Sequence, residues 1–360
     1  MKEKILSSYE LIKALCDTFG PSGCEDAVAE LIKEQVAPIA ESITTDKLGN
    51  VIAKLPCASK DNNNNKKKLM ISAHMDEVGF MISRVCDDGY LKISEIGGIN
   101  GAVLAGRHVC VGDELSQING VIASKAIHQK KSEDRLKADK IDKLYIDIGA
   151  DSAEKAAEYA NVGTFATFAP NFARFGKDGR YISSKALDDR LGCALIIELM
   201  RTLADAGELP LDVYFCFTVR EEIGVSGALT AANTIRPDYA IVLETTAVAD
   251  LCDVDESMRV ASLGSGGAIS LMDRSTIYNR DFIDLALEVA KKNEIPVQVK
   301  KYVSGGNDAG HIHKSTTGVK TLALSAPTRY LHSPNCVACY DDYEHMLKLL
   351  QKLILTGELR

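Results

Sequence analysis

The sequence of 360 residues contains no tryptophan, and aromatic residues make up only 6% of it. Enzymes that cleave carbohydrates usually offer aromatic rings for sugars to stack on, so this composition argues against that class. No apolar run approaches the roughly 20 residues that a membrane-spanning helix needs. Positive charge is in deficit, because 42 basic residues face 50 acidic ones and the formal net charge is −8. This balance argues against a nucleic-acid-binding protein.

The N-terminus shows no signal-peptide pattern, because acidic residues interrupt its apolar positions and no small-residue cleavage site follows. Ten cysteines in such a chain are expected to be reduced thiols, and we expect a cytoplasmic protein. Cys336 and Cys339 have CxxC spacing, but no thioredoxin-like strand precedes them and no second CxxC pair exists to complete a zinc site. We interpret this pair as two small apolar residues in a loop.

Two kinds of pattern divide the chain. From Lys185 onward, helical and strand patterns alternate, and the first 75 residues show the same patterns. Such alternation is typical of an α/β domain with a mostly parallel central sheet flanked by helices. Residues 76–168 instead have short apolar runs punctuated by glycines, with one helical insert, which indicates a small β-barrel or sandwich. We predict an α/β domain at residues 1–75 and 169–360, interrupted by a β-rich inserted domain at residues 76–168.

Histidines and carboxylates occur at the expected ends of four strands and at the start of one helix. They are His74 and Asp76 after KLMISA, Glu221 and Glu222 after FTVR, Glu244 at the end of DYAIVLE, His332 after TLALSAP, and Asp188 and Asp189 before RLGCALIIELM. The carboxyl ends of parallel strands meet along one edge of a sheet, where ligands bind. We therefore predict that these side chains share one cleft.

Two histidines with several carboxylates form the ligand set expected for zinc or a similar divalent ion. The predicted ligands are His74, Asp188, Glu222, Glu244 and His332. Their three negative charges would face the four positive charges of two divalent ions, and one bridging hydroxide would make the cluster neutral. Glu221, outside this set, is then free to act as general base, and Asp76 can orient the imidazole of His74.

Each of these residues alone also has an ordinary structural interpretation. A single histidine can be a satisfied core residue, two glutamates can lie on a solvated surface, and Asp188 with Asp189 can cap a helix. Their occurrence together at one sheet edge favours a functional site. Another pair, His311 and His313, is interpreted as structural, because residues two apart on a helix do not face each other.

These motifs make the chain resemble the tetrahedral aminopeptidases, a family of cytosolic metallopeptidases also labelled glutamyl aminopeptidase, metallopeptidase family forty-two or endoglucanase. The resemblance extends over nearly the whole chain, and its most specific motifs are HMDEVGF, ALDDRLG, REEIG and RYLHS. It implies a zinc-peptidase-like α/β fold with an inserted β domain. It also implies a hydrolase that removes N-terminal residues from peptides.

Carried over by motif, the resemblance implies one metal ion on His74, Asp188 and Glu244, with Asp188 bridging to a second ion completed by Glu222 and His332. Glu221 falls at the general base and Asp76 at its supporting carboxylate. The family often has aspartate in place of Glu244. Zinc is the expected metal, with cobalt or manganese as alternatives.

The resemblance further implies a cis peptide bond after Asp188, a place for Asp308 near the substrate, and a dodecamer built from dimers through the inserted domain. We expect peptides as substrates and neither nucleic acid nor a membrane as partner. Two other functions stay open on the residues alone. One is a carboxypeptidase or N-acyl deacylase that uses the same dinuclear site, and the other is a non-catalytic binding protein with this fold.

Overall fold

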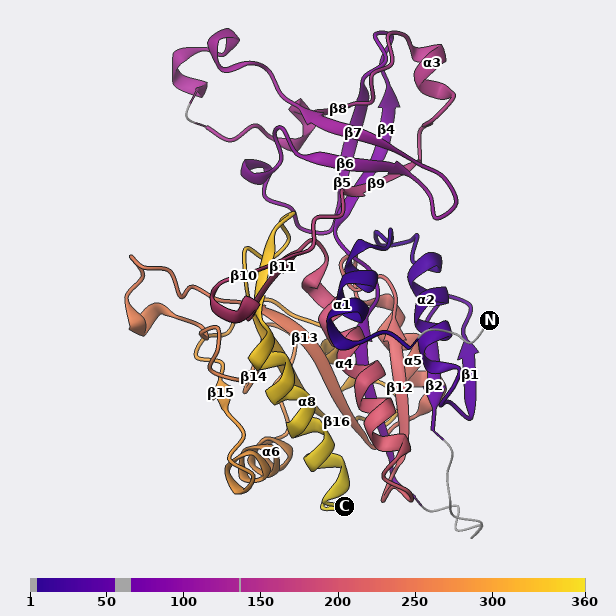
Figure 1. Ribbon diagram of the computed structural model, residues 1–360, viewed down its shortest axis with the longest axis vertical. Helices are drawn as coiled ribbons and strands as arrows, with labels where there is room; N and C mark the ends of the chain where they lie inside the picture. The colour runs from indigo at the N-terminus through magenta and orange to yellow at the C-terminus, as the bar shows by residue number, and fades with distance from the viewer. Residues whose placement is uncertain (1–4, 56–65, 136, 360) are drawn as a thin grey trace.

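The computed structural model describes residues 5–55, 66–135 and 137–359. They form an α/β unit that contains one large sheet and, above it in Figure 1, a separate closed barrel. This is the predicted α/β architecture, and the inserted unit is a barrel rather than a sandwich. Within the described residues, no helix combines the length and the apolar composition needed to span a bilayer.

The large sheet has eleven strands, and its centre is parallel. Its strands are β1 (Ser42–Thr45), β2 (Val51–Lys54), β3 (Lys68–His74), β10 (Ala173–Phe175), β11 (Tyr181–Ser184), β12 (Asp212–Thr218), β13 (Tyr239–Ala247), β14 (Gly267–Ile269), β15 (Val297–Val299), β16 (Lys320–Arg329) and β17 (Cys336–Cys339). In the centre, β12, β3, β13 and β16 are parallel neighbours, whereas β2 and β17 join the two sides of this block antiparallel. Strand β3 is buried along almost its whole length, which explains its continuous apolar run.

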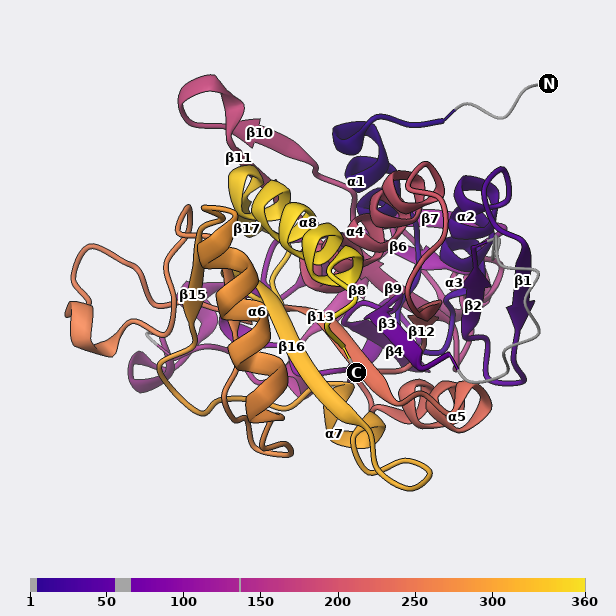
Figure 2. The same cartoon turned by 90° about the horizontal axis from the view of Figure 1, so that it is seen from below.

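Helices cover both faces of the sheet. The helices of this unit are α1 (Ser8–Asp17), α2 (Asp26–Val36), α4 (Leu187–Ala204), α5 (Ser226–Ile235), α6 (Arg280–Lys292), α7 (Ala309–Ile312) and α8 (Tyr340–Leu355). Helix α4 packs on β3 and β13 and contacts α1 and α8, while α5 and α7 lie on the opposite face (Figure 2). Most residues of α4 are buried, which is expected of a helix enclosed by the sheet and other helices.

The barrel contains six strands in the order β4-β5-β8-β7-β6-β9. They are β4 (Gly79–Val85), β5 (Leu91–Ile96), β6 (His108–Gly112), β7 (Gln117–Ala123), β8 (Tyr145–Asp147) and β9 (Phe165–Phe168), and the predicted helical insert is α3 (Ala153–Ala157). Apolar side chains fill the interior, including Phe80 and Phe168, whose rings meet edge to face with centroids 5.6 Å apart. Closure removes the free strand edges that an open sheet would expose.

Two local expectations from the sequence are wrong. The pair Cys336 and Cys339 lies in strand β17 rather than in a loop, and both side chains are buried free thiols. A four-residue strand of apolar residues shows no alternation of polar and apolar positions, so the sequence pattern does not predict it. Strand β13, expected to end at Glu244, continues to Ala247 because its last residues pair with β16.

Candidate metal centre

The candidate site lies where β3 and β13 separate. Pairing between these parallel strands ends at Ser72 and Val242, so the backbones no longer pair at His74 and Glu244, two residues further along. On its other side, β3 stays paired with β12 up to His74 and Thr218. A gap at the carboxyl edge of a parallel sheet is the usual place for a ligand in this class of fold.

Asp188 lies between the two histidines. Nε2 of His74 is 3.4 Å from Oδ1 of Asp188, and Nε2 of His332 is 3.2 Å from Oδ2 of the same carboxylate. Oε2 of Glu244 is 3.8 Å from Nε2 of His74, and Oε1 of Glu222 is 3.3 Å from Nε2 of His332. The structure thus brings together all five side chains that were predicted as ligands.

The other ring nitrogen of each histidine is held by a backbone carbonyl. Nδ1 of His74 donates to the carbonyl of Asp76 at 3.1 Å, and Nδ1 of His332 donates to the carbonyl of Gly98 at 2.8 Å. Because a carbonyl can only accept, these contacts keep a proton on Nδ1 and direct Nε2 toward the carboxylates. A metal-binding histidine is oriented in the same way. Since Gly98 follows β5, the barrel unit helps to orient His332.

Asp188 and Asp189 have different contacts at the start of α4. The peptide bond between them is cis, as expected from the resemblance. Oδ1 of Asp189 accepts the backbone amide of Gly192 at 3.0 Å, which is the contact of a helix-capping residue. The helix-cap interpretation therefore describes Asp189, whereas the carboxylate of Asp188 faces the two histidines.

Asp76 holds the loop that carries the two glutamates. Its Oδ1 accepts the amide of Glu221 at 3.0 Å, and its Oδ2 accepts the amide of Glu222 at 3.0 Å and the hydroxyl of Ser22 at 2.5 Å. The carboxylate is 3.5 Å from Nδ1 of His74, which is farther than the carbonyl of Asp76 itself. Asp76 therefore contacts both histidine and loop, and its carboxylate lies closer to the loop amides than to His74.

The donor atoms of this cluster fit divalent cations. Within this cluster, four buried carboxylate oxygens accept no hydrogen bond from the described residues, namely Oδ1 of Asp188, Oδ2 of Asp189, Oε1 of Glu222 and Oε1 of Glu244. Such oxygens are costly to bury unless a cation satisfies them. Ligand atoms of His74, Asp189 and Glu244 lie within 4.8 Å of one another, as do those of His74, Asp188 and Glu222. Asp189 is thus an additional candidate ligand that was not among the predicted ones.

Burial and the surplus of carboxylates shift the pKa values in the cluster. Burial and the charge of Asp188 raise the pKa of Glu222 to about 7. Burial also raises the pKa of Glu221 and of Glu244. Although burial opposes it, the hydrogen bond to Asp188 and the charge of Glu222 raise the pKa of His332 to about 9. The cluster therefore favours positive charge, which either protons or metal ions can supply.

A buried ion cluster joins the barrel to the start of α4. Nζ of Lys185 is 2.6 Å from Oε1 of Glu77, and a guanidinium nitrogen of Arg190 is 3.7 Å from the same oxygen. The other oxygen of Glu77 accepts the hydroxyl of Thr167, in strand β9 of the barrel, at 2.8 Å. Glu77 directly follows Asp76, so this cluster fixes the chain beside the candidate centre. No local pattern in the sequence distinguishes these charges from surface charges.

The remaining predicted residues have contacts of their own. Asp308 is buried, and its Oδ2 accepts the hydroxyl of Thr218 at 2.5 Å. Nδ1 of His311 and Nδ1 of His313 donate to the backbone carbonyls of Val225 and Ala309. Neither of these histidines belongs to a metal-type group among the described residues. The role of Asp308 near a substrate stays a prediction.

A sheet with a parallel centre, a cluster of histidines and carboxylates able to hold divalent ions at its carboxyl edge, and an inserted barrel together match the arrangement expected of a metal-dependent hydrolase. A model of the M42 glutamyl aminopeptidase family matches residues 49–349, and the chain belongs to this family. The protein is therefore an enzyme that hydrolyses peptide bonds, an aminopeptidase by family. The suspected relation to tetrahedral aminopeptidases is confirmed.

Named relatives cover almost the full chain. Lysyl aminopeptidase of Pyrococcus furiosus is 33% identical over 96% of this chain and 96% of its own length. Glutamyl aminopeptidase of Lactococcus lactis is 27% identical over 97% of this chain and 96% of its own length.

Solved structures of similar chains have the same fold. A TET aminopeptidase from a marine sediment archaeon of the Thaumarchaeota superimposes with a TM-score of 0.92 at 35% identity, covering 98% of this chain and 97% of its own. The TET1 peptidase of Pyrococcus horikoshii, described as assembling into a tetrahedron or a large octahedral shell, gives a TM-score of 0.84 at 34% identity, covering 97% and 99%.

Proposed function

We propose that this aminopeptidase removes N-terminal residues from peptides with the help of two divalent ions. His74, Asp188 and Glu244 would hold one ion, and Asp188, Glu222 and His332 the other. The observation that carries this proposal is the position of Asp188, whose two oxygens lie 3.4 Å and 3.2 Å from the Nε2 atoms of the two histidines. Zinc suits this donor set best, and cobalt or manganese are alternatives.

Bound at this place, the ions would polarise the scissile carbonyl and make water a nucleophile near neutral pH. The carboxylate of Glu221 accepts a proton from the attacking water and later donates it to the nitrogen of the leaving amine. Asp76 supports this transfer by holding the amide of Glu221 at 3.0 Å. Glu222, the second glutamate of the pair, would bind metal, whereas Glu221 transfers the proton.

A metal-reconstituted activity screen tests this function. The protein is stripped of metal, reloaded with zinc, cobalt or manganese, and offered a panel of aminoacyl-anilides with free or acetylated amino groups. We expect hydrolysis of the free-amine substrates only, two bound ions per chain by elemental analysis, and loss of turnover in Glu221→Gln. Cleavage of acetylated substrates, or of peptides from the carboxyl end, would instead establish the deacylase or carboxypeptidase alternative.

We also propose that the chain forms a homo-oligomer, a dodecamer built from dimers, with residues 76–168 as the inserted dimerisation domain. The shells described for the TET1 peptidase of Pyrococcus horikoshii support this proposal. Light scattering of the purified protein measures the mass, and a monomer at micromolar concentration would refute it. The cytoplasm is the proposed location, where the described free thiols stay reduced.

A further inference from the structure

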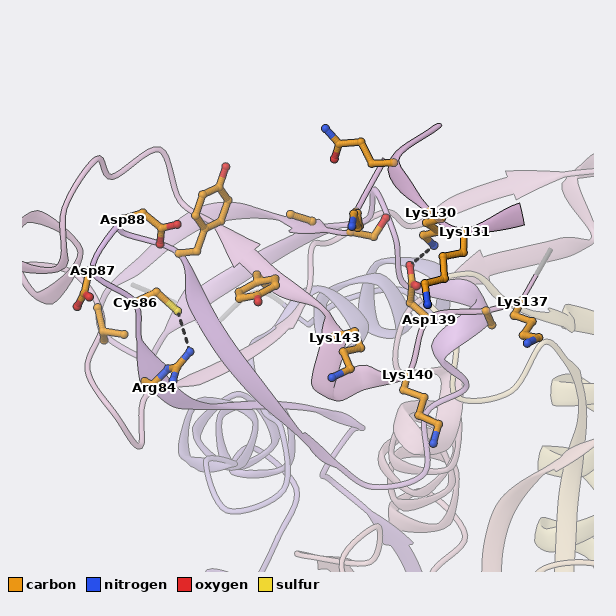
Figure 3. Close-up of a pocket in the computed structure, with 18 residues that line it drawn as sticks. Arg84, Cys86, Asp87, Asp88, Lys130, Lys131, Lys137, Asp139, Lys140 and Lys143 are labelled. Atoms are coloured by element: carbon orange, nitrogen blue, oxygen red, sulfur yellow. Dashed lines mark hydrogen bonds and ion pairs between the residues drawn. The ribbon is translucent and has the colours of Figure 1, made fainter. Parts of the chain in front are cut away.

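A large cavity lies on the barrel unit, lined by none of the residues of the candidate metal centre. Its volume is about 1290 Å³. One wall is the long connection between β7 and β8, and the other is the turn between β4 and β5 (Figure 3). Neither the family motifs nor the proposed reaction makes use of this cavity.

Basic side chains dominate the lining. They are Arg84 and six lysines, namely Lys125, Lys130, Lys131, Lys137, Lys140 and Lys143, against three aspartates. Residues 125–143 contain seven basic and four acidic residues, a net charge of +3, so the rest of the chain carries −11. Positive charge is therefore concentrated at one place on an otherwise acidic protein, where it can attract anions.

Part of this charge is neutralised by the protein, and Nζ of Lys143 lies 3.8 Å from Oδ2 of Asp142. Nζ of Lys130 pairs with Oδ2 of Asp139 at 2.5 Å, and this contact joins two parts of the β7–β8 connection. The side chains of Lys125, Lys131 and Lys140 are exposed and have no ion-pair or hydrogen-bond partner among the described residues. Three ammonium groups are thus available to a ligand.

The connection that carries the lysines is held by contacts to the barrel and within itself. Nζ of Lys92 donates to the carbonyl of Asp142 at 2.6 Å and lies over the ring of Tyr145 at 4.0 Å from its centroid. The side chain of Arg135 donates to the carbonyl of Lys130 at 3.3 Å. These contacts hold the lysines close to one another, as a binding site for an anion requires.

The charged side chains that line the cavity are unevenly distributed along it. In Figure 3, Lys131 and Lys140 lie with most other lysines and with Asp139 at one end, whereas Asp87 and Asp88 lie with Arg84 at the opposite end. Tyr90 and Tyr145 line the same cavity. A long uniform polyanion would meet the two aspartates unfavourably. A ligand with several negative charges at one end and a neutral, ring-containing body matches this arrangement better.

We propose that this cavity binds a small molecule that carries a chain of phosphate groups. Lysine ammonium groups are compact point charges that bind phosphate through charge-assisted hydrogen bonds. Two sources share this chemistry, inorganic polyphosphate and nucleoside polyphosphates. The tyrosines favour the nucleoside form, because an aromatic side chain can stack on a base.

Equilibrium dialysis of the metal-loaded, full-length protein tests this site, with labelled tripolyphosphate and ATP as probes and excess Mg²⁺ to protect the bound ions. The test variant is Lys131→Gln/Lys140→Gln. The matched control is Lys291→Gln/Lys292→Gln, which removes two exposed lysines from α6. We expect saturable binding below about 1 mM, weakened at least about tenfold in the test variant and unchanged in the control. Tyr90→Ala should weaken ATP but not tripolyphosphate if the nucleoside form is the ligand.

Three outcomes would overturn the proposal. Absence of binding by either probe at 1 mM is the first, and equal binding by wild type and test variant is the second, since the probe would then sit elsewhere, including on the metal ions. The third is equally tight binding of a hexaglutamate peptide, because the cavity would then attract any anion rather than phosphate chains.

Discussion

Asp76 accepts the backbone amide of Glu221 at 3.0 Å, and its other oxygen accepts the neighbouring amide of Glu222 at the same distance. One buried carboxylate therefore positions both acids of the sequence REE. This relationship fixes where the proposed base and the proposed ligand stand relative to His74. It also explains how a loop outside the sheet can present two carboxylates reproducibly.

Asp76→Asn is expected to lower both activity and metal affinity. An amide offers only one acceptor oxygen, so the loop loses one of its two amide contacts. We expect metal affinity and kcat each to fall by roughly tenfold to a hundredfold, with the fold retained by circular dichroism. Asp205→Asn, an exposed residue after α4, serves as the control. Wild-type kinetics in Asp76→Asn would show that the loop needs no such support.

Glu221→Gln and Glu222→Gln should both lose activity, but for different reasons. The first is expected to keep its metal content and lose kcat by roughly 10²- to 10⁴-fold, because only the proton acceptor is removed. The second is expected to lose metal, because a ligand is removed. Elemental analysis beside steady-state kinetics separates the two. The assignment is reversed if Glu221→Gln loses metal and Glu222→Gln keeps it.

Removal of metal should lower the thermal stability as well as the activity. Without cations, the buried carboxylates of Asp188, Glu222 and Glu244 have unpaired oxygens and must either repel one another or take up protons. At a hundredfold excess of the ion over its Kd, binding is expected to stabilise the fold by about 2.7 kcal/mol. Differential scanning calorimetry before and after chelation measures the shift. Glu222→Gln should show a smaller shift, and an equal one would count against this ligand.

Lys185→Met should destabilise the junction between the barrel and the α/β unit. The substitution leaves the buried carboxylate of Glu77 without the ammonium group 2.6 Å away. We expect a loss of roughly 3 kcal/mol in the free energy of unfolding, partly recovered in Lys185→Met/Glu77→Gln. Lys33→Met removes an exposed ion pair with Glu30 and should cost less than about 1 kcal/mol. Similar losses in both single variants would contradict this account of the buried pair.

Glu25→Gln should change the pH dependence of stability. Burial raises the pKa of Glu25 to about 7. The unfolded chain has a pKa of about 4.3, so the stabilising contribution of the protonated form is complete below that pH and is lost as pH rises through about 7. Glutamine keeps the acceptor for the amides of Gly23 and Arg220 but does not ionise.

The stability of the glutamine variant relative to wild type should therefore rise between pH 5 and pH 8, by on the order of 2 kcal/mol. Thermal unfolding of both proteins across this range measures the difference. A constant difference across the range would mean that Glu25 does not titrate there.

The sequence predicted the strand ends well where composition is strongly apolar. The apolar run before His74 is typical of a buried strand, because both faces of β3 are covered. The acids after β12 are easy to recognise because they follow a similarly apolar strand. The predictions failed where tertiary pairing decides the outcome. β13 extends past Glu244 because β16 continues beside it, and Cys336 to Cys339 form a strand because β11 and β16 lie next to them.

By itself, the sequence determined the order of helices and strands, the inserted β-rich segment, and the residue types able to bind metal, because these depend on periodicity and on side-chain chemistry. Only the tertiary structure decided which groups meet. Asp188 and His332 are separated by 144 residues, yet Nε2 of His332 lies 3.2 Å from the carboxylate of Asp188. The buried pair Lys185–Glu77 and the cavity on the barrel that lysines line likewise depend on contacts between segments that are distant in the sequence. Such proximity arises from the packing of the whole chain and leaves no local pattern in the sequence.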